Sequence, residues 1–531
     1  MIFGARSGDV LGRALEKIFP GAQFAEAAVP GMAALAVSVN AREAVIGPLT
    51  LPERAGCWHC ARMRMAAAGE EEAPEGTRDM SEAAARALID SDTNRLLDHV
   101  LIVDAATEQA AFHRVIPLPE CPVCGGAAAF PRTDDEDSLS GWVDPRTGIV
   151  SRIVVEEPET DVVIVTAAPP HLMDASGTLR RFPIGWGKGL TLADAFLSAV
   201  GEAIERYAPS LPDVRRIISK RPDELDGERL DPREFALYTA AQYQRGDFPF
   251  ARFDPEICHP WVRGKWLNGG GAVWTPALFT YLSLTLTRAQ NFCQGSSNGL
   301  AAAWDWEEAA RRATLELVER DAFMRAWLGR RPGQRVEVDD LRLRQVVESV
   351  ERLGATVEVY ALPSACGTTV LCLALGDGKR YPGATIGLSA NLDPALALRG
   401  AVLELAQTGP HLRRMMQSGA WRVPEAPEEV REMPDHAAYY FPAERAAAFD
   451  RLRTNDAPAS IRDVGQVGNL RPIGNRPFAG ALRVALVDVT SADVATGPFR
   501  VVRAVSPDLL PISYGYGLER AGSTRDIHPI W

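Results

Sequence analysis

The sequence predicts an α/β or α+β protein of two domains, residues 1–134 and 135–531. Short runs rich in β-branched residues, such as DVVIVTAA and TTVLCLALG, alternate with alanine- and leucine-rich segments of helical periodicity. A chain of 531 residues exceeds one ordinary domain, and the acidic stretch FPRTDDEDSLSG is typical of a boundary. The content of 46% hydrophobic and 24% charged residues is a globular balance, so each domain should bury a core.

The first domain should combine strands with short helices. MAALAVSV, EAVIGPLT and HVLIVDAAT have the β-branched content of strands. The residues after GCWHC are expected to begin a helix. The charged, alanine-rich segment from Gly69 to Leu97 is interpreted as a loop followed by a helix.

Two C-x-x-C pairs in this domain, Cys57 with Cys60 and Cys121 with Cys124, predict a tetrahedral zinc site of four thiolates. Four protein ligands would leave no open position for chemistry, so the site should be structural. A redox-active C-x-x-C pair and plain buried thiols are the alternatives. His59 is expected to lie beside the metal rather than bind it, and the remaining cysteines should be ordinary core residues.

The second domain carries the motif E-x-x-E-R twice, in SAVGEAIERYA and in LELVERDA. Its members are Glu202, Glu205 and Arg206 in one copy and Glu316, Glu319 and Arg320 in the other. At 100° per residue the three members of each copy share one helix face. For one copy alone, a solvated face with intrahelical salt bridges is the favoured interpretation. A repeat on two apolar helices favours carboxylates that coordinate something, because uncompensated buried carboxylates are costly.

Several convergent glutamates suit Mg²⁺, a hard cation that takes carboxylate oxygens and is often shared with nucleotide phosphates. A weaker third segment, ALALRGAVLELAQ, has the same apolar frame and contains Arg399 and Glu404. There is no Walker A motif, because Gly-Lys in GWGKGLT is followed by Gly where Ser or Thr is required. Lys188 in this glycine-rich turn is the candidate to approach a phosphate.

Composition narrows the classes of function. The formal net charge of −12 argues against a general binder of nucleic acid or of anionic membranes. The N-terminal MIFGARSGDVLGR lacks the apolar core of a signal peptide, and no apolar run is long enough for a membrane helix. We therefore expect a cytoplasmic protein.

Three segments together resemble the ATP site of the YcaO superfamily, in the same order and at compatible separations: GKGLTLADAFLSAVGEAIERYA, SSNGLAAAWDWEEAARRATLELVERDA and ALALRGAVLELAQT. The resemblance covers residues 135–531 and implies an α/β fold that binds ATP and Mg²⁺ through helix glutamates, without a P-loop. It implies that Glu202, Glu205, Glu316 and Glu319 hold Mg²⁺ or phosphate, with Glu202 and Glu316 catalytic. The further nucleotide-site positions that it implies are Lys188, Ser198, Arg206, Ser297, Asn298, Glu308, Arg320, Arg399 and Glu404.

Residues 30–130 resemble the zinc-bearing end of the ThiF-like partner of azole-forming YcaO proteins, on IGPLTLPERAGCWHCARMR and HRVIPLPECPVCGG. Unlike fuller members, this part has no nucleotide-binding glycine motif and no evident leader-binding module before Ala33. The resemblance therefore implies a YcaO unit preceded by a small zinc-binding α/β domain. Leader recognition would come from a separate protein, and relatives are commonly homodimers.

The activity implied by the resemblance is that of an ATP-dependent cyclodehydratase of thiazole/oxazole-modified peptide biosynthesis. A Cys, Ser or Thr side chain of a ribosomal precursor peptide attacks the preceding carbonyl. The carbonyl oxygen takes the γ-phosphoryl group of ATP and departs as phosphate, which leaves an azoline. Metal-holding carboxylates can place Mg²⁺ where phosphoryl charge accumulates. Oxidation to the azole would need a flavin dehydrogenase as a partner.

The C-terminal segment SYGYGLERAGSTRDIHPIW stands where azole-forming relatives have a proline-rich tail thought to reach the active site. Trp531, through its carboxylate, and His528 are candidates for proton transfer. A packed aromatic tail is the alternative.

Three other functions stay open at this stage. GSSNG, from Gly295 to Gly299, fits the G-x-S-x-G elbow of α/β-hydrolases, with His411, His436 and His528 downstream. Other YcaO proteins make thioamides or macrocyclic amidines by the same activation of the backbone oxygen. A catalytically silent relative could instead present the peptide to an active enzyme. The sequence does not name the precursor peptide or the number and order of rings.

Overall fold

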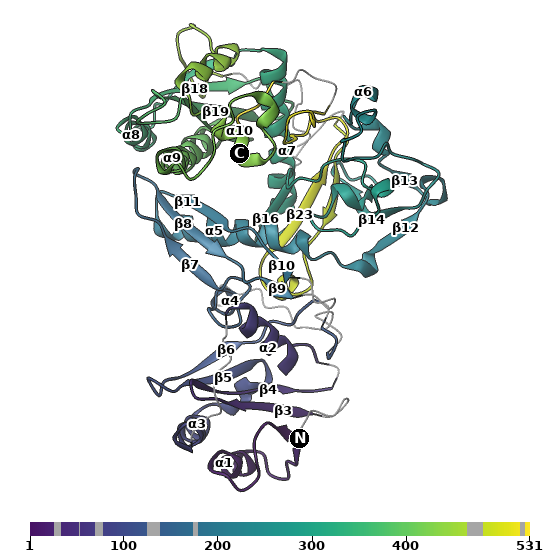
Figure 1. Cartoon of the computed structure of the whole chain (residues 1–531), viewed down its shortest axis with the longest axis vertical. Helices are drawn as coiled ribbons and strands as arrows, with labels where there is room; N and C mark the ends of the chain where they lie inside the picture. Colours follow the sequence, from purple (N-terminus) through teal and green to yellow (C-terminus); the bar gives the residue numbers. More distant parts are fainter. Residues whose placement is uncertain are drawn as a thin grey trace. The chain divides into compact units, whose positions relative to one another are not determined.

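The computed structural model describes residues 1–25, 33–52, 54–69, 78–119, 121–124, 138–173, 179–464, 482–520 and 526–531. The chain forms two compact units (Figure 1). The first contains Met1–Val154, Thr166–Gly185 and Thr490–Phe499, and the second contains Val155–Val165, Trp186–Val489 and Arg500–Trp531. The predicted boundary between residues 134 and 135 lies outside the described residues. No helix in the described ranges is long and apolar enough to cross a bilayer.

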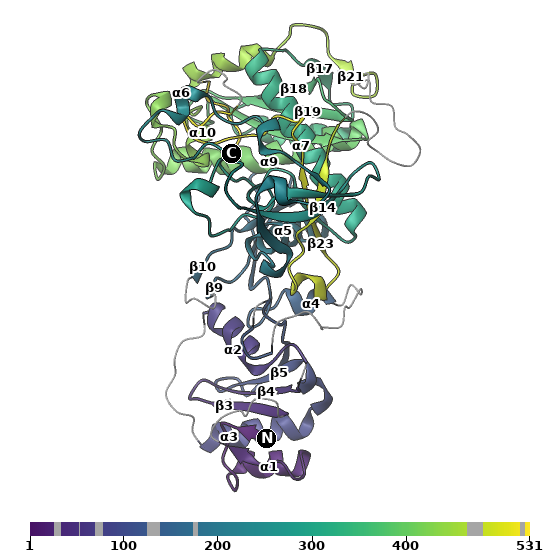
Figure 2. The same cartoon turned by 90° about the vertical axis from the view of Figure 1, so that its right-hand side faces the viewer.

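The first unit is built on a six-stranded sheet in the order β2-β1-β3-β4-β5-β6. Its strands are β1 (Ile2–Phe3), β2 (Phe24–Ala25), β3 (Ala34–Val39), β4 (Glu43–Thr50), β5 (His99–Asp104) and β6 (Ala110–Arg114), and its helices are α1 (Val10–Ile18), α2 (Trp58–Ala67), α3 (Arg78–Asp90) and α4 (Ser138–Trp142). Helices α1 and α3 cover one face of the sheet (Figure 2). Because side chains alternate along a strand, Leu101 and Val103 pack toward α1 and α3, whereas Val100 and Ile102 pack toward α2.

One buried ion pair joins distant parts of the chain within this unit. Arg64 of α2 is fully buried, and its Nη2 lies 3.0 Å from Oδ2 of Asp493. Its Nε also donates to the carbonyl oxygen of Ile116, at 2.7 Å. Asp493 belongs to the late segment Thr490–Phe499, which therefore completes the packing around α2.

The second unit contains two large sheets. The first has the order β13 (Glu228–Arg229), β15 (Ala272–Pro276), β14 (His259–Trp266), β22 (Ala485–Asp488), β23 (Arg500–Val505) and β16 (Leu300–Ala303), with β12 (Ile217–Lys220) also paired to β14. The second has the order β20 (Ala384–Asn391), β19 (Thr368–Leu375), β18 (Thr356–Leu362), β17 (Gln334–Glu337) and β21 (Ala459–Ser460). The long helices are α5 (Leu192–Tyr207), α7 (Trp306–Gly329), α8 (Leu341–Glu351) and α9 (Pro394–Ser418), with the short α6 (Ala240–Tyr243) and α10 (Met433–Ala438).

Smaller sheets are formed by three and by two strands. The three-stranded sheet has the order β11 (Gly185–Gly189), β8 (Val163–Ala168) and β7 (Arg152–Val155), and the pair is β9 (Leu172–Met173) with β10 (Leu179–Arg180).

The five-stranded sheet has a helix layer on each face. Val359 and Val370 pack with α8 and α9, whereas Tyr360 and Leu371, their neighbours along the strands, pack with Trp327 of α7. Helix α7 also packs against β16 and β23. The two longest helices therefore approach β20 from different sides, which positions the side chains described below.

Most of the predicted strands and helices are confirmed, and GWGKG is the informative exception. It was expected to form a turn, but it is strand β11, and the helix begins after Thr191. A Cβ atom on Gly187 would lie 1.9 Å from the carbonyl oxygen of Ala195 on α5. The glycines therefore let the strand lie directly against the helix backbone. In AVWTPALFTYLSL only Ala272–Pro276 is a strand, and a 3₁₀ turn follows.

Candidate active site

Helix α5 presents the first acidic pair. Its start is capped by Thr191, whose hydroxyl accepts from the backbone N–H of Asp194 at 3.1 Å. Arg206 lies 3.5 Å from the carboxylate of Glu205 and 3.9 Å from that of Glu202. One oxygen of Glu202 also accepts from the backbone N–H of Trp186 in β11, at 3.1 Å. The three motif residues therefore share one helix face, and β11 lies beside it.

Helix α7 repeats this arrangement. Arg320 lies 3.2 Å from Glu319 and 3.8 Å from Glu316. The second oxygen of each glutamate accepts a backbone N–H, that of Gly299 for Glu316 and that of Ala390 in β20 for Glu319, both at 3.0 Å. Backbone donors thus fix both carboxylates independently of the arginine.

Helix α9 and strand β11 add a fifth carboxylate and a lysine. Nζ of Lys188 lies 3.2 Å from Oε2 of Glu404, with both side chains about three-quarters buried. Arg399, one turn earlier on α9, pairs with Asp194 at 3.5 Å on a more exposed part of the surface.

The five carboxylates act on one another through space. Burial raises the pKa of Glu205 to about 8, and Glu316 and Glu202 add to this rise while Arg206 opposes it. Burial likewise raises the pKa of Glu319 to about 7, with Glu404 and Glu316 adding to the rise and Arg320 opposing it. The carboxylates of α5, α7 and α9 therefore form one cluster, and the neighbouring arginines and lysine do not fully offset their burial and mutual repulsion.

This donor set fits a hard divalent cation. Five carboxylates from three helices have Lys188, Arg206 and Arg320 as their ion-pair partners. Added positive charge would favour the ionised form of each glutamate, and carboxylate oxygens are the ligands that Mg²⁺ prefers. The lysine and the two arginines offer N–H donors to phosphate oxygens in the same place. The residues present thus fit both Mg²⁺ and phosphate groups.

Several residues predicted for the nucleotide site lie apart from this cluster or at its edge. Glu308 pairs with Arg311 and Arg312 on its own helix, both at 2.6 Å, as a surface helix glutamate would. Ser198 is exposed, one turn before Glu202. Ser297 is half-buried, and its carbonyl oxygen accepts from Leu300 in the turn before β16. Their roles toward a nucleotide stay predictions.

Trp531 lies in an aromatic group next to β11. Its ring centroid is 5.0 Å from that of His411 on α9, and His411 is in turn 5.1 Å from Trp186. Since the backbone N–H of Trp186 donates to Glu202, this aromatic group lies beside the acidic cluster. A catalytic role of Trp531 stays a prediction.

The hydrolase alternative does not agree with the local structure. In a nucleophile elbow the serine lies on a sharp turn between a strand and a helix. Here Ser297 follows a 3₁₀ turn (Arg288–Gln290) and irregular backbone, and it precedes strand β16. The glycine after it, Gly299, has a φ of +84°, and its Cβ would lie 2.6 Å from the carbonyl oxygen of Ala504. The GSSNG segment therefore forms a tight entry into a strand.

Sequence reasoning missed Arg503, which acts on the same carboxylates. It lies in β23 and is only 6% exposed. Burial lowers the pKa of its guanidinium group to about 10, while Glu316 and Glu205 oppose that change. The available signal in the sequence was the presence of arginines in the otherwise apolar segment FRVVRAV, since a charged residue in a buried strand indicates a special role.

The four cysteines predicted to bind zinc meet in the first unit. Sγ of Cys57 lies 3.9 Å from that of Cys60 and 3.6 Å from that of Cys121, and Cys60 and Cys124 are 3.7 Å apart. All four sulfur atoms lie within 4.8 Å of one another. Four sulfurs around zinc at its usual bond length would be about 3.8 Å apart, whereas disulfide sulfurs would be about 2 Å apart. The cluster therefore fits a tetrahedral metal site, and the backbone N–H of Leu118 donates to Cys60 as a further support.

Fold and site together define an α/β protein with a site lined by carboxylates, arginines and a lysine from several helices and a strand. A family model described as YcaO cyclodehydratase, ATP- and Mg²⁺-binding, matches residues 186–510, more than half of the chain. The chain belongs to the YcaO family. The matched residues include both E-x-x-E-R helices, Glu404 and Arg503.

One relative of the chain is a protein with no assigned function. An uncharacterized protein of Methanothermobacter thermautotrophicus is 28% identical over 231 residues, which are 42% of this chain and 56% of that protein. The match therefore spans little more than half the length of that relative.

Two solved structures share the fold over nearly the whole chain. One is a heterocyclase in complex with substrate and cofactor, with a TM-score of 0.71 and 18% identity, covering 94% of this chain and 78% of that one. The other is the heterocyclase TruD, with a TM-score of 0.63 and 18% identity, covering 99% of this chain and 80% of that one.

Proposed function

We propose that this protein is an ATP-dependent cyclodehydratase that converts Cys, Ser or Thr residues of a ribosomal precursor peptide to azolines. The observation that carries the proposal is the pairing of two E-x-x-E-R helices around one cluster of largely buried carboxylates, between 11% and 34% exposed, with Lys188 and Glu404 joining them. Membership of the YcaO family supports the same assignment.

The proposed reaction closes a five-membered ring and loses one water. The side-chain sulfur or oxygen bonds to the preceding carbonyl carbon and gives up its proton. The former carbonyl oxygen takes the γ-phosphoryl group of ATP, which becomes ADP. The C–O bond then breaks, phosphate departs, and the amide nitrogen loses its proton as the C=N bond forms. An amide oxygen is a poor leaving group until it is phosphorylated, and this explains the need for ATP.

The residues of the cluster would bind and orient the reacting groups. Mg²⁺ held by Glu202, Glu205, Glu316 and Glu319 would supply charge neutralisation at the phosphates. Lys188 and Arg320 would donate hydrogen bonds to phosphate oxygens. The backbone N–H groups of Gly299 and Ala390 hold two of the carboxylates in place, so little reorganisation would be needed when substrates bind.

The four-cysteine cluster would hold a structural Zn²⁺ in this proposal. We further propose that a separate protein recognises the leader and that a flavin dehydrogenase oxidises the azolines. Residues 1–134 would then be the zinc-binding domain and residues 135–531 the catalytic one, in a protein that forms a homodimer.

Peptide-dependent ATP consumption tests the proposal. The full chain is incubated with ATP, Mg²⁺ and a precursor peptide rich in Cys and Ser, with its leader-binding partner where one is encoded nearby. We expect phosphate release that depends on the peptide, loss of one water from the peptide per ring, and loss of one alkylatable thiol per cysteine ring.

Each alternative product leaves a different result in this assay. A thioamide would replace oxygen by sulfur without consuming a cysteine thiol. An amidine would lose water and consume an amine while every thiol stays reactive. Peptide binding without peptide-stimulated phosphate release would mean that the chain presents the peptide to another enzyme. Any of these three results would refute the azoline proposal.

A further inference from the structure

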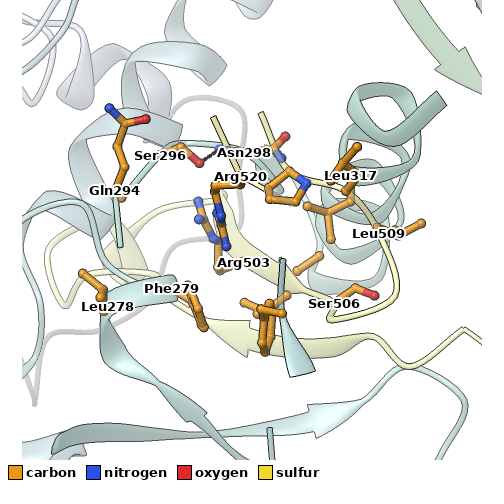
Figure 3. Close-up of a pocket in the computed structure, with 16 residues that line it drawn as sticks. Leu278, Phe279, Gln294, Ser296, Asn298, Leu317, Arg503, Ser506, Leu509 and Arg520 are labelled. Carbon is orange, nitrogen blue, oxygen red and sulfur yellow. Dashed lines mark hydrogen bonds between the residues drawn. The ribbon is translucent and has the colours of Figure 1, made fainter. Parts of the chain in front are cut away.

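A cavity lies in the second unit, next to the turn that leads into β16 (Figure 3). Its volume is about 40 Å³, which is room for about three water molecules. Apolar side chains, among them Phe235, Leu278 and Phe279, form one part of its wall. The polar part is formed by Gln294, Ser296, Asn298, Arg503, Ser506 and Arg520. Two of these are arginines, and no residue that lines the cavity is acidic in the part of the chain that the structure describes.

Arg503 is the unexplained residue of this cavity. Only 6% of its surface is exposed. Its Nε and Nη1 have no hydrogen-bond partner among the described residues. Burying a charged group without partners is expensive, because buried charges are normally paired, so this guanidinium group calls for a partner. Its neighbours on β23 are valine and alanine, so packing alone would favour an apolar side chain here.

The acidic cluster does not supply the missing partner. Glu316 and Glu205 attract Arg503 through space, but their ion pairs within 4.0 Å are with Arg320 and Arg206. No ion pair of Arg503 with a carboxylate is formed within the described ranges. Arg503 therefore lines the cavity and also interacts through space with the acidic cluster, which leaves its unpartnered N–H groups without an ion pair.

Two further side chains offer complementary groups to the same space. Asn298 is 5% exposed, and its side-chain oxygen has no partner in the described structure, while its backbone N–H donates to Ser296 at 3.3 Å. Arg520 is 6% exposed, and its Nε donates to the carbonyl oxygen of Ala236 at 2.7 Å, which fixes the direction of its guanidinium plane. Figure 3 shows both arginines between the turn of Asn298 and the phenylalanine wall.

We propose that this cavity is an oxyanion subsite that binds a phosphate-sized tetrahedral anion between Arg503 and Arg520. Planar guanidinium groups bind such oxygens through paired N–H donors. The protonated oxygen of monohydrogen phosphate would donate to the side-chain oxygen of Asn298. The assignment to phosphate chemistry rests on the proposed function, in which a phosphoryl group is transferred and phosphate is released beside the acidic cluster. Free phosphate and the terminal phosphoryl group of a nucleotide share this chemistry.

Calorimetric titration of inorganic phosphate into the intact protein, without nucleotide or peptide, tests the subsite. We expect saturable binding to the wild-type chain. In Arg503→Gln the affinity should fall by about tenfold or more, because hydrogen bonds to a charged group are lost. The matched control is Arg263→Gln, which alters an exposed arginine of the same sheet, and it should keep the wild-type affinity.

The absence of saturable phosphate binding, or equal affinity in wild type and Arg503→Gln, would overturn the proposal. If Arg503→Gln does not melt cooperatively, Arg520→Gln replaces it with the same expectation. Repeating the phosphate titration with a saturating non-hydrolysable ATP analogue and Mg²⁺ distinguishes free phosphate from the terminal phosphoryl group of a nucleotide as the occupant. Retained phosphate binding assigns the subsite to free phosphate, and mutual exclusion assigns it to the nucleotide's terminal phosphoryl group. The titration measures binding and not turnover. If phosphate binds but the separate assay finds no peptide-dependent ATP consumption, the proposed function is refuted and the subsite proposal stands.

Discussion

Replacing Glu316 by glutamine separates catalysis from folding. The amide keeps the size of the side chain and an oxygen that can accept from Gly299, but it removes the charge. The ion pair with Arg320 at 3.8 Å is worth about 4 kcal/mol at an effective dielectric constant of about 20, before desolvation is counted. The cost of burying the Glu316 carboxylate and its repulsion of Glu205 oppose this gain. In the variant, Arg320 would still have Glu319 as an ion-pair partner, at 3.2 Å. The free energy of unfolding should therefore change by only about 1–2 kcal/mol.

The effect on turnover should be much larger. Loss of one preorganised electrostatic group at a phosphoryl site should lower kcat by about 10²–10³. Peptide-stimulated phosphate release measures turnover, and urea titration followed by circular dichroism measures unfolding. Glu307→Gln alters an exposed carboxylate on the same helix and should leave both measurements unchanged. Turnover within a few-fold of wild type, or a collapse of cooperative unfolding in Glu316→Gln, would refute the assignment of this carboxylate to the reaction.

Three further outcomes follow from the structure. Metal analysis of the purified protein should find one zinc per chain, and Cys121→Ser should release it; an unchanged metal content in that variant would contradict the four-thiolate site. Burial lowers the pKa of His436 to about 4, and its Nε2 accepts from a backbone N–H, so the neutral form is favoured in the folded state. Its contribution of about 3 kcal/mol should be complete above pH 6.5 and be lost as pH falls toward 4, and urea titrations of His436→Gln should lack this part of the acid slope. Gly187→Ala should destabilise the chain by about 1–3 kcal/mol or more because its Cβ would overlap Ala195, and an unchanged urea midpoint would show that β11 can move away from α5.

Local periodicity accounts for what the sequence predicts well. Residues three and four apart on a helix are neighbours whatever the rest of the fold does, so the faces of Glu202 with Arg206 and of Glu316 with Arg320 follow from spacing alone. The four-cysteine cluster is predicted for a similar reason, because each C-x-x-C pair already presents two sulfurs together.

Long-range pairing accounts for what was missed. Arg503 reaches the site because β23 pairs with β16, where it lies opposite Leu300, and no local pattern sets a register across two hundred residues of chain. The strand GWGKG was interpreted as a turn because glycine favours turns, but close packing on α5 prevails over that preference. Nothing in the composition of Thr490–Phe499 indicates that it packs with the N-terminal residues.

The pairing of Arg64 with Asp493 has a consequence for synthesis on the ribosome. The first unit contains Met1–Val154, yet it lacks the carboxylate for a fully buried guanidinium until residues 490–499 have emerged. At ordinary elongation rates that delay is roughly 20 to 70 s. The cysteine cluster, in contrast, is complete once residue 124 has left the exit tunnel. Under the proposed zinc assignment, metal capture would precede final consolidation of the same unit, and a nascent chain would keep its N-terminal part open to chaperones until translation is nearly finished.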